Sequence, residues 1–138
     1  MEGRVCIITG SGQGLGRAFA KSFAALGAVS IIAEINADNA KRVADEIIEA
    51  GGKALAIETD VANSDSVQAM VERTLAEFGR IDVLVNNAAL LQSINRVPVD
   101  EISNEEWDNV LRVNVTGAFY CVRAVVGTMR KAGWGRII

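Results

Sequence analysis

The stretch from residue 4 to residue 17 reads Arg4-Val5-Cys6-Ile7-Ile8-Thr9-Gly10-Ser11-Gly12-Gln13-Gly14-Leu15-Gly16-Arg17. A short apolar run passes through a cluster of glycines directly into a helical pattern, which is typical of a strand, a phosphate-binding turn and a helix. The spacing is G-x-x-x-G-x-G with an additional glycine at position 12, and a strict G-x-G-x-x-G is absent. Residues without a Cβ atom let the backbone turn sharply and let a pyrophosphate approach free N–H groups at the start of a helix. We therefore expect a dinucleotide to contact Gly10, Ser11, Gln13, Gly14, Leu15 and Gly16.

The composition is that of one globular domain. The chain has 138 residues, of which 50% are hydrophobic, so it can bury one sizeable core. We expect a single domain over residues 1–138. The net charge of −3 comes with no basic stripe, so neither nucleic acid nor an anionic membrane surface is an expected partner. No Lys-Ser/Thr pair follows the glycines, which argues against a P-loop NTPase.

The cysteines and the N-terminus indicate the cellular location. Cys6 and Cys121 both lie in apolar patterns and are expected to be buried thiols in a reducing cytosol. The first residues lack the features of a signal peptide, and no apolar run approaches the roughly 20 residues that span a bilayer. We therefore expect a cytoplasmic protein that does not enter a membrane. The chain contains no histidine, which excludes His-based triads and the usual zinc ligand sets, so no metal site is expected.

Strand and helix patterns alternate along the chain. The first helix is expected to end at Gly27, with an inner face formed by Leu15, Phe19, Phe23 and Leu26. Further strands are expected over residues 29–33, 54–59 and 81–85, and from residue 136. The later helices are expected to have the N-cap residues Asn36, Ser64 and Ser103.

The last helical pattern runs from Ser103 to about Lys131. Gly117 and Gly127 lie inside it, so we expect a break or bend near residues 114–117. The stretch from Leu90 to Ile102 shows no clear period and is expected to be a loop.

This alternation predicts an α/β fold with a doubly wound, Rossmann-type parallel sheet that is truncated in its fifth strand. Ligands of such sheets bind at the carboxyl ends of the strands. The glycine turn, Glu34, Asp60 and Asn87 all map to that edge, so we expect one site there.

Glu34 follows the second expected strand, 20 positions after Gly14. A carboxylate there can accept hydrogen bonds from the ribose hydroxyls of an adenosine, and it repels a 2′-phosphate. Gln13 and Ile35, which we also expect to contact the cofactor, offer no cation for that phosphate. The sequence therefore predicts NAD rather than NADP as the cofactor.

Polar residues also follow the third and fourth expected strands. Asp60 could bond the adenine amino group while Val61 packs on the ring, although an ordinary turn aspartate fits the same position equally well. Beyond the fourth strand, amide groups of Asn86 and Asn87 could brace the loops and the cofactor ribose. Asn114 lies among apolar residues in the last helical pattern, and it should have a specific partner because burying an unpaired amide is costly.

Together these residues resemble the classical short-chain dehydrogenase/reductase family. The resemblance rests on Thr9-Gly10-x-x-x-Gly14-x-Gly16, Asp60-Val61, Asn86-Asn87-Ala88-Ala89 and Val113-Asn114-Val115. It implies cofactor contacts at Asn87, Ala88 and Ala89 and makes Asn114 the helix asparagine of the family's catalytic tetrad. Ala89 stands where the family usually has glycine.

The resemblance also implies an activity: hydride transfer between NAD and a small alcohol or carbonyl substrate. The family's serine and Tyr-x-x-x-Lys pair would lie beyond Ile138, and Tyr120 is followed at the fourth place by Ala124. We therefore expect these 138 residues to be the cofactor-binding part of such an oxidoreductase and to be inactive alone. A non-catalytic dinucleotide-binding module remains an alternative, as does a flavin or S-adenosylmethionine site on the same fold. The resemblance also implies that the protein forms a homo-oligomer through exposed apolar surface on the long helix.

Overall fold

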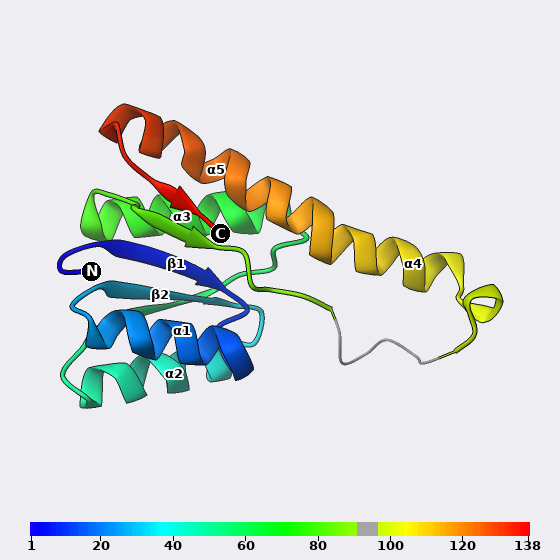
Figure 1. The fold of residues 1–138 in the computed structure, drawn as a ribbon, viewed down its shortest axis with the longest axis horizontal. Coiled ribbons are helices and arrows are strands. Elements are labelled where there is room, and N and C mark those ends of the chain that lie inside the picture. Colours follow the sequence, from blue (N-terminus) through cyan, green and yellow to red (C-terminus); the bar gives the residue numbers. More distant parts are fainter. Residues whose placement is uncertain (91–96) are drawn as a thin grey trace.

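The computed structural model describes residues 1–90 and 97–138, and its centre is a parallel sheet (Figure 1). The strand order is β3-β2-β1-β4-β5. Every pairing is parallel, with Ile7 opposite Ile31 on one side and Leu84 on the other. The strands are β1 (Val5–Thr9), β2 (Val29–Glu34), β3 (Lys53–Glu58), β4 (Val83–Val85) and β5 (Arg136–Ile137). The expected doubly wound α/β fold is confirmed.

Helices cover both faces of the sheet. In Figure 1, α1 and α2 lie on one side of the strands, and α3 and α5 lie on the other. Alternating side chains of β1 belong to two hydrophobic cores, one on each face of the sheet. Ile7 packs with residues of α3 and α5, and Cys6 and Ile8 pack with residues of α1 and α2. The helices are α1 (Gly14–Ala25), α2 (Ala37–Glu49), α3 (Ser64–Phe78), α4 (Asn104–Leu111) and α5 (Gly117–Ala132).

The inner face of α1 differs from the prediction. Leu15, Phe19 and Leu26 are 72%, 40% and 60% exposed. The buried residues of the helix are Gly16, Ala20 and Ala24, which lie four apart beside the expected apolar stripe. Small side chains let the helix axis approach the sheet, and the Ser30 hydroxyl on β2 donates to the Ala20 carbonyl at 2.8 Å. The face of α1 that is buried is therefore the one whose small residues allow close contact with the sheet.

The remaining helix ends follow the sequence signals with one correction. Asn36 caps α2 by accepting from the Asn39 N–H, and Ser103 caps α4 by accepting from the Glu106 N–H. The cap of α3 is Asn63 rather than Ser64, because the Asn63 side chain accepts from two N–H groups of the first turn. An asparagine can serve as N-cap as well as a serine, and here it stands one residue earlier.

The long helical region has an irregular turn at the expected place. Between α4 and α5, residues Arg112–Thr116 form a π-helical turn, η2. The region Asn104–Ala132 is long and apolar enough to cross a membrane by length and composition alone. Of the expected loop from Leu90 to Ile102, residues 91–96 lie outside the described part, and a short 3₁₀ turn, η1, spans Val99–Glu101.

Candidate functional site

A cleft of about 620 Å³ lies at the carboxyl ends of the strands. Its volume is within the roughly 300–1,000 Å³ typical of ligand sites. All the sequence-predicted cofactor residues line it except Ser11, Gly14 and Asn86. The lining consists of Gly10, Gln13, Leu15, Gly16, Glu34, Ile35, Thr59, Asp60, Val61, Asn87, Ala88, Ala89, Leu90 and Val113.

Helix α1 begins at this cleft without the capping side chain and the acidic residue that are found at the starts of α2, α3 and α4. Its N-cap residue, Gln13, makes no side-chain cap hydrogen bond, and its first turn holds no acidic residue. In contrast, α2, α3 and α4 each have a capping side chain and an acidic residue in the first turn. The first N–H groups of α1 are therefore available to an anion, and the helix dipole favours one.

The glycines of the turn serve different needs. Gly10 and Gly14 have φ values of +64° and +54°, a region that side chains rarely adopt. A Cβ atom at Gly10 would also lie 2.8 Å from the Ala88 Cα, and one at Gly16 would lie 2.6 Å from the Asn87 Nδ2. The turn thus packs tightly against the loop after β4.

Ser11 turns its side chain away from the cleft. It is fully buried, and its hydroxyl donates to the Ile8 carbonyl at 2.6 Å. Any contact of Ser11 or Gly14 with a ligand is therefore left to the backbone and stays a prediction.

The Glu34 carboxylate lies at the end of β2, in the cleft wall, and is only 9% exposed. Its Oε2 accepts from the Gly12 N–H at 3.0 Å, and its Oε1 accepts from the Asn36 N–H at 3.2 Å. Two backbone donors thus fix a buried anion, while each oxygen keeps capacity to accept another hydrogen bond.

Thr9 joins the glycine turn to the loop after β4. Its hydroxyl accepts from the Asn87 and Ala88 N–H groups, both at 3.0 Å, and donates to the Val85 carbonyl at 3.3 Å. The Asn87 amide donates in return to the carbonyls of Thr9 and Gly10 at 2.9 and 3.1 Å. Asn87 therefore braces the neighbouring loop, as expected. Nothing in the sequence pattern marks Thr9 as part of this brace.

Asp60 forms the ordinary aspartate turn that the sequence allowed as an alternative to a contact with adenine. Its Oδ1 accepts from the Ala62 N–H at 2.9 Å, as in an Asx turn, and the residue also lines the cleft. Val61 is mostly buried, and α5 comes so close to it that a Cβ atom at Gly117 would lie 2.9 Å from a Val61 methyl group.

Asn114 has the specific partner that its position requires. Its Oδ1, in η2, accepts from the Leu90 N–H at 2.7 Å. Asn114 does not line the large cleft but a small cavity of about 30 Å³ behind it, together with Thr9 and Cys121. In this structure it therefore holds the loop after β4, and a catalytic role stays a prediction. Tyr120 packs against the core beside α3, as expected of a packing residue.

The cleft is also lined by three residues that were not predicted to contact a cofactor, namely Thr59, Leu90 and Val113. Thr59 directly precedes Asp60, and its place at the end of a strand was a usable signal. Val113 has no such signal, because its exposure depends on how η2 sits over the loop.

The cations nearest the glycine turn are already paired. Arg17, Lys21 and Arg42 all pair with the Glu46 carboxylate, and the hydrogen bond from Arg17 is the main reason that the pKa of Glu46 lies below its ordinary value. Arg42 also donates to the Gly12 carbonyl at 2.9 Å. Among the described residues that line the cleft there is no lysine or arginine.

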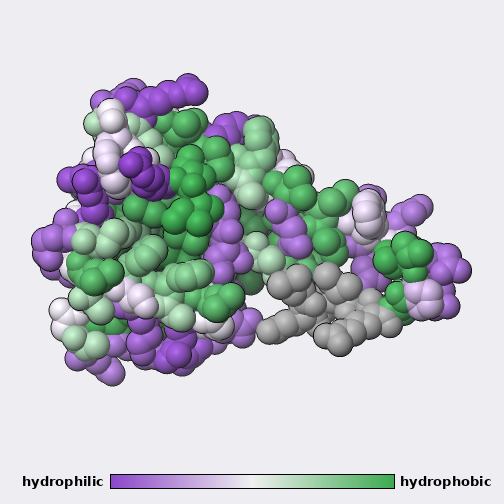
Figure 2. All heavy atoms as spheres, viewed as in Figure 1, coloured by the Kyte–Doolittle hydropathy of each residue, from purple (hydrophilic) through white to green (hydrophobic). Residues whose placement is uncertain are grey.

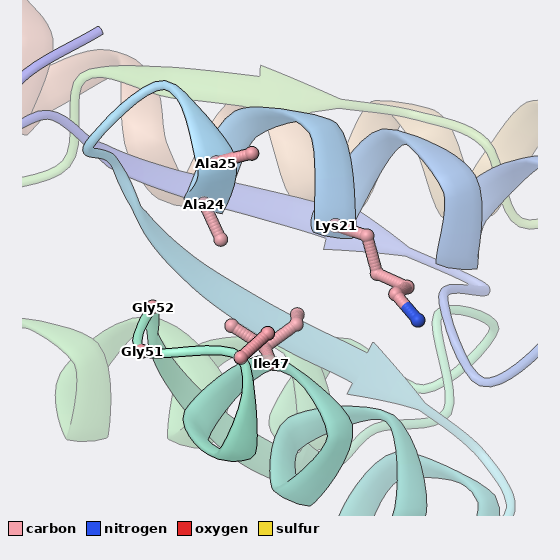
Figure 3. Close-up of a pocket in the computed structure, with 7 residues that line it drawn as sticks. Lys21, Ala24, Ala25, Ile47, Gly51 and Gly52 are labelled. Carbon is pink, nitrogen blue, oxygen red and sulfur yellow. The ribbon is translucent and has the colours of Figure 1, made fainter.

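Two other features carry no comparable chemistry. A hollow of about 190 Å³ between the ends of α1 and α2 is lined by small and aliphatic residues and Lys21 (Figure 3), and Lys21 is already paired with Glu46 at 3.2 Å. Burial raises the pKa of the Cys6 and Cys121 thiols to about 11, so neither is a ready nucleophile at neutral pH.

Comparison with known proteins agrees with this architecture. An oxidoreductase of Thermotoga maritima, named as uncharacterized, is 41% identical over 140 residues, which cover 100% of this chain and 53% of that protein. A metagenomic short-chain oxidoreductase in complex with NADP has a TM-score of 0.92 and 33% identity, covering 99% of this chain and 61% of that one. An NAD⁺-bound xylitol dehydrogenase has a TM-score of 0.93 and 32% identity, with 99% and 52% coverage.

The chain thus spans about half the length of curated relatives that it matches. The sequence model of the short chain dehydrogenases matches residues 4–138, which is nearly the whole chain. The glycine turn, the parallel sheet and the cleft at its carboxyl edge fit that match, and the chain belongs to the short-chain dehydrogenase family.

Proposed function

We propose that this chain binds NAD in the cleft at the carboxyl ends of its strands. The observation that carries the choice of NAD is the Glu34 carboxylate, which is buried in the cleft wall and held by the Gly12 and Asn36 N–H groups. Family membership does not choose the cofactor, because one similar structure holds NADP and another holds NAD⁺. A fixed anion at this place can accept from the ribose hydroxyls and repels a 2′-phosphate.

The cleft also fits the rest of a dinucleotide. The uncapped start of α1 offers N–H groups to the pyrophosphate. At one end of the cleft, Asp60, Val61 and Ile35 supply a polar and apolar wall for the adenosine. At the other, Asn87, Ala88 and Ala89 lie where the nicotinamide half would pass.

For the whole protein we propose hydride transfer between NAD and a small alcohol or carbonyl substrate, which is the reaction that the family resemblance implies. Bound NAD supplies the hydride acceptor or donor. Of the family's tetrad this stretch contains Asn114, whose Oδ1 accepts from the N–H of Leu90, a residue that lines the cleft. A non-catalytic dinucleotide-binding module is the second candidate, since such a module needs only the cleft and the uncapped start of α1.

We further propose a cytoplasmic homo-oligomer that associates through the long helical region. Trp107, Leu111, Val115 and Phe119 lie four residues apart and are 41–60% exposed, and Figure 2 shows apolar side chains along this part of the molecule. Arginines at 112 and 123 interrupt the region, which disfavours burial in hydrocarbon. A second protein surface is the better match for this face.

Glu34→Arg tests the cofactor assignment. The substitution removes the acceptor of the ribose hydroxyls and places a cation beside them, so the dissociation constant for NADH should rise at least about tenfold, as expected for a lost hydrogen bond to a charged group. Isothermal titration calorimetry with NADH measures it. Glu49→Arg, an exposed glutamate at the far end of α2, is the control and should leave NADH binding unchanged. An unchanged dissociation constant in Glu34→Arg would contradict the assignment.

A further inference from the structure

Gly12 is the glycine of the turn that the G-x-x-x-G-x-G spacing does not require. Its φ lies outside the left-handed region, in contrast to Gly10 and Gly14. Conformational freedom therefore does not explain a glycine here. The explanation is space, because an ideal Cβ atom on Gly12 would lie 2.6 Å from the Glu34 Cγ and 2.9 Å from the Glu34 Cδ.

A methyl group at position 12 would be too close to atoms on two sides. On its other side it would meet the Asn39 Cβ at 2.8 Å, an atom fixed to the backbone of α2. The Gly12 backbone is itself held at both ends. Its N–H donates to the Glu34 Oε2 at 3.0 Å, and its carbonyl accepts from the Arg42 Nη2 at 2.9 Å. The Glu34 side chain is the group that must move.

We propose that Gly12 is a specificity-determining position: its missing side chain and its N–H hold the Glu34 carboxylate where that carboxylate selects NAD over NADP. This inference rests on the proposed function. Gly12 acts through Glu34 and is a positioning residue. A side chain at position 12 pushes the carboxylate off the Gly12 N–H, which costs an acceptor for the ribose hydroxyls and removes the fixed charge that repels a 2′-phosphate.

The test is the ratio of two dissociation constants, measured by titration of the protein with NADH and with NADPH. Gly12→Ala should weaken NADH binding about tenfold, the scale of a lost hydrogen bond to a charged group, and should leave NADPH binding unchanged or tighter. General damage to the turn would weaken both cofactors alike and leave the ratio unchanged. An unchanged ratio would therefore overturn the inference.

Gly127→Ala is the matched control. Gly127 lies on α5, its φ is outside the left-handed region, and a Cβ atom there meets nothing within 4 Å. The same chemical change at this open position should alter neither dissociation constant nor their ratio. A shift in the ratio here as large as in Gly12→Ala would show that the effect is not local, and it too would overturn the inference.

A double-mutant cycle covers the case in which Gly12→Ala folds poorly. Glu34→Ala removes the Cγ and Cδ atoms that the new methyl group meets, so Gly12→Ala should lower the unfolding midpoint less in the Glu34→Ala background than alone. The contact with the Asn39 Cβ remains, so the rescue is partial. Equal losses in both backgrounds would contradict the inference.

The outcomes separate this inference from the proposed function. If the unsubstituted protein binds neither dinucleotide, the proposed function fails and the inference fails with it. If the unsubstituted protein prefers NADH and Gly12→Ala keeps that preference, the inference alone fails.

Discussion

At the scale of single residues, Thr9 shows how much of the site depends on one hydroxyl group. The side chain is 1% exposed and makes three hydrogen bonds, two of them to the backbone N–H groups that open the loop after β4. Asn87 and Ala88, which those bonds fix, line the cleft. The geometry of this end of the cleft is thus set by a side chain of β1.

Thr9→Val keeps the shape of the side chain and removes the hydroxyl. It leaves the Ala88 N–H without its acceptor, whereas the Asn87 N–H keeps the Val85 carbonyl at 3.1 Å. We therefore expect a loss of about 1–3 kcal/mol in the free energy of unfolding and weaker NADH binding. Urea denaturation and NADH titration measure the two effects. Thr128→Val, the same change at a partly exposed position of α5, is the control. Equal stability of the two variants would contradict this role for Thr9.

At the scale of elements, Asp82 fastens the amino ends of three strands, at the edge opposite the cleft. Its carboxylate is 6% exposed and accepts from Arg4, from the Val5 N–H and from Arg80. Its backbone bonds to β1 and to Arg136 of β5. Arg4 in turn stacks on Trp134, 3.8 Å from the ring centroid. Asp82 therefore links β1, β4 and β5, to β1 through its carboxylate and its N–H and to β5 through its carbonyl.

Asp82 also gives a pH dependence to the fold. Burial acts to raise the pKa of Asp82, but the hydrogen bonds from Arg80, the Val5 N–H and Arg4 outweigh it and hold the pKa below its ordinary value of 3.8. The unfolded chain therefore takes up the proton first as the pH falls. The stabilisation is complete above about pH 3.8 and is lost as the pH falls through the lower pKa of the folded state.

Asp82→Asn should lower the free energy of unfolding by roughly 1.5–3 kcal/mol near pH 6. The difference in the free energy of unfolding between Asp82→Asn and the unsubstituted protein should become smaller as the pH falls below 3.8. Urea denaturation across this pH range measures it. Asp45→Asn is the control, because its exposed pair with Lys41 contributes little. A difference in the free energy of unfolding that stays constant down to the lowest pH would contradict this role for Asp82.

The sequence predicted the order and type of the elements because strand and helix periods alternate clearly and because Gly27, Gly51, Gly79 and Gly133 end helices with positive φ. The buried face of α1 was not predictable from apolar periodicity alone. Two stripes of residues lie side by side on that helix, one of large apolar side chains and one of small residues. The stripe of small residues is the one that packs against the sheet.

The site was predictable wherever a residue's place follows from the end of a strand. Glu34 and Asn87 reach the cleft for that reason. What the sequence could not give is which partner each side chain finds. Ser11 bonds back to Ile8, Asn114 bonds to Leu90, and Thr9 bonds across 78 positions to Asn87, and these pairings depend on the folded packing.

At the scale of the whole molecule, the apolar stripe of Trp107, Leu111, Val115 and Phe119 is the surface on which association would depend. Leu111→Glu places a charge in its middle, so the proposed oligomer should dissociate, and sedimentation velocity should show a smaller species. Leu26→Glu is the control, because Leu26 is 60% exposed on α1 and outside the stripe. A protein that sediments as a monomer before any substitution would contradict the proposal.

Binding of a dinucleotide in the cleft and selection of NAD by Glu34 can be measured together by calorimetric titration of the unsubstituted protein with NADH and with NADPH. NADH should bind with at least about tenfold higher affinity than NADPH, the scale of one hydrogen bond to a charged group. Tighter binding of NADPH would show that Glu34 does not select NAD.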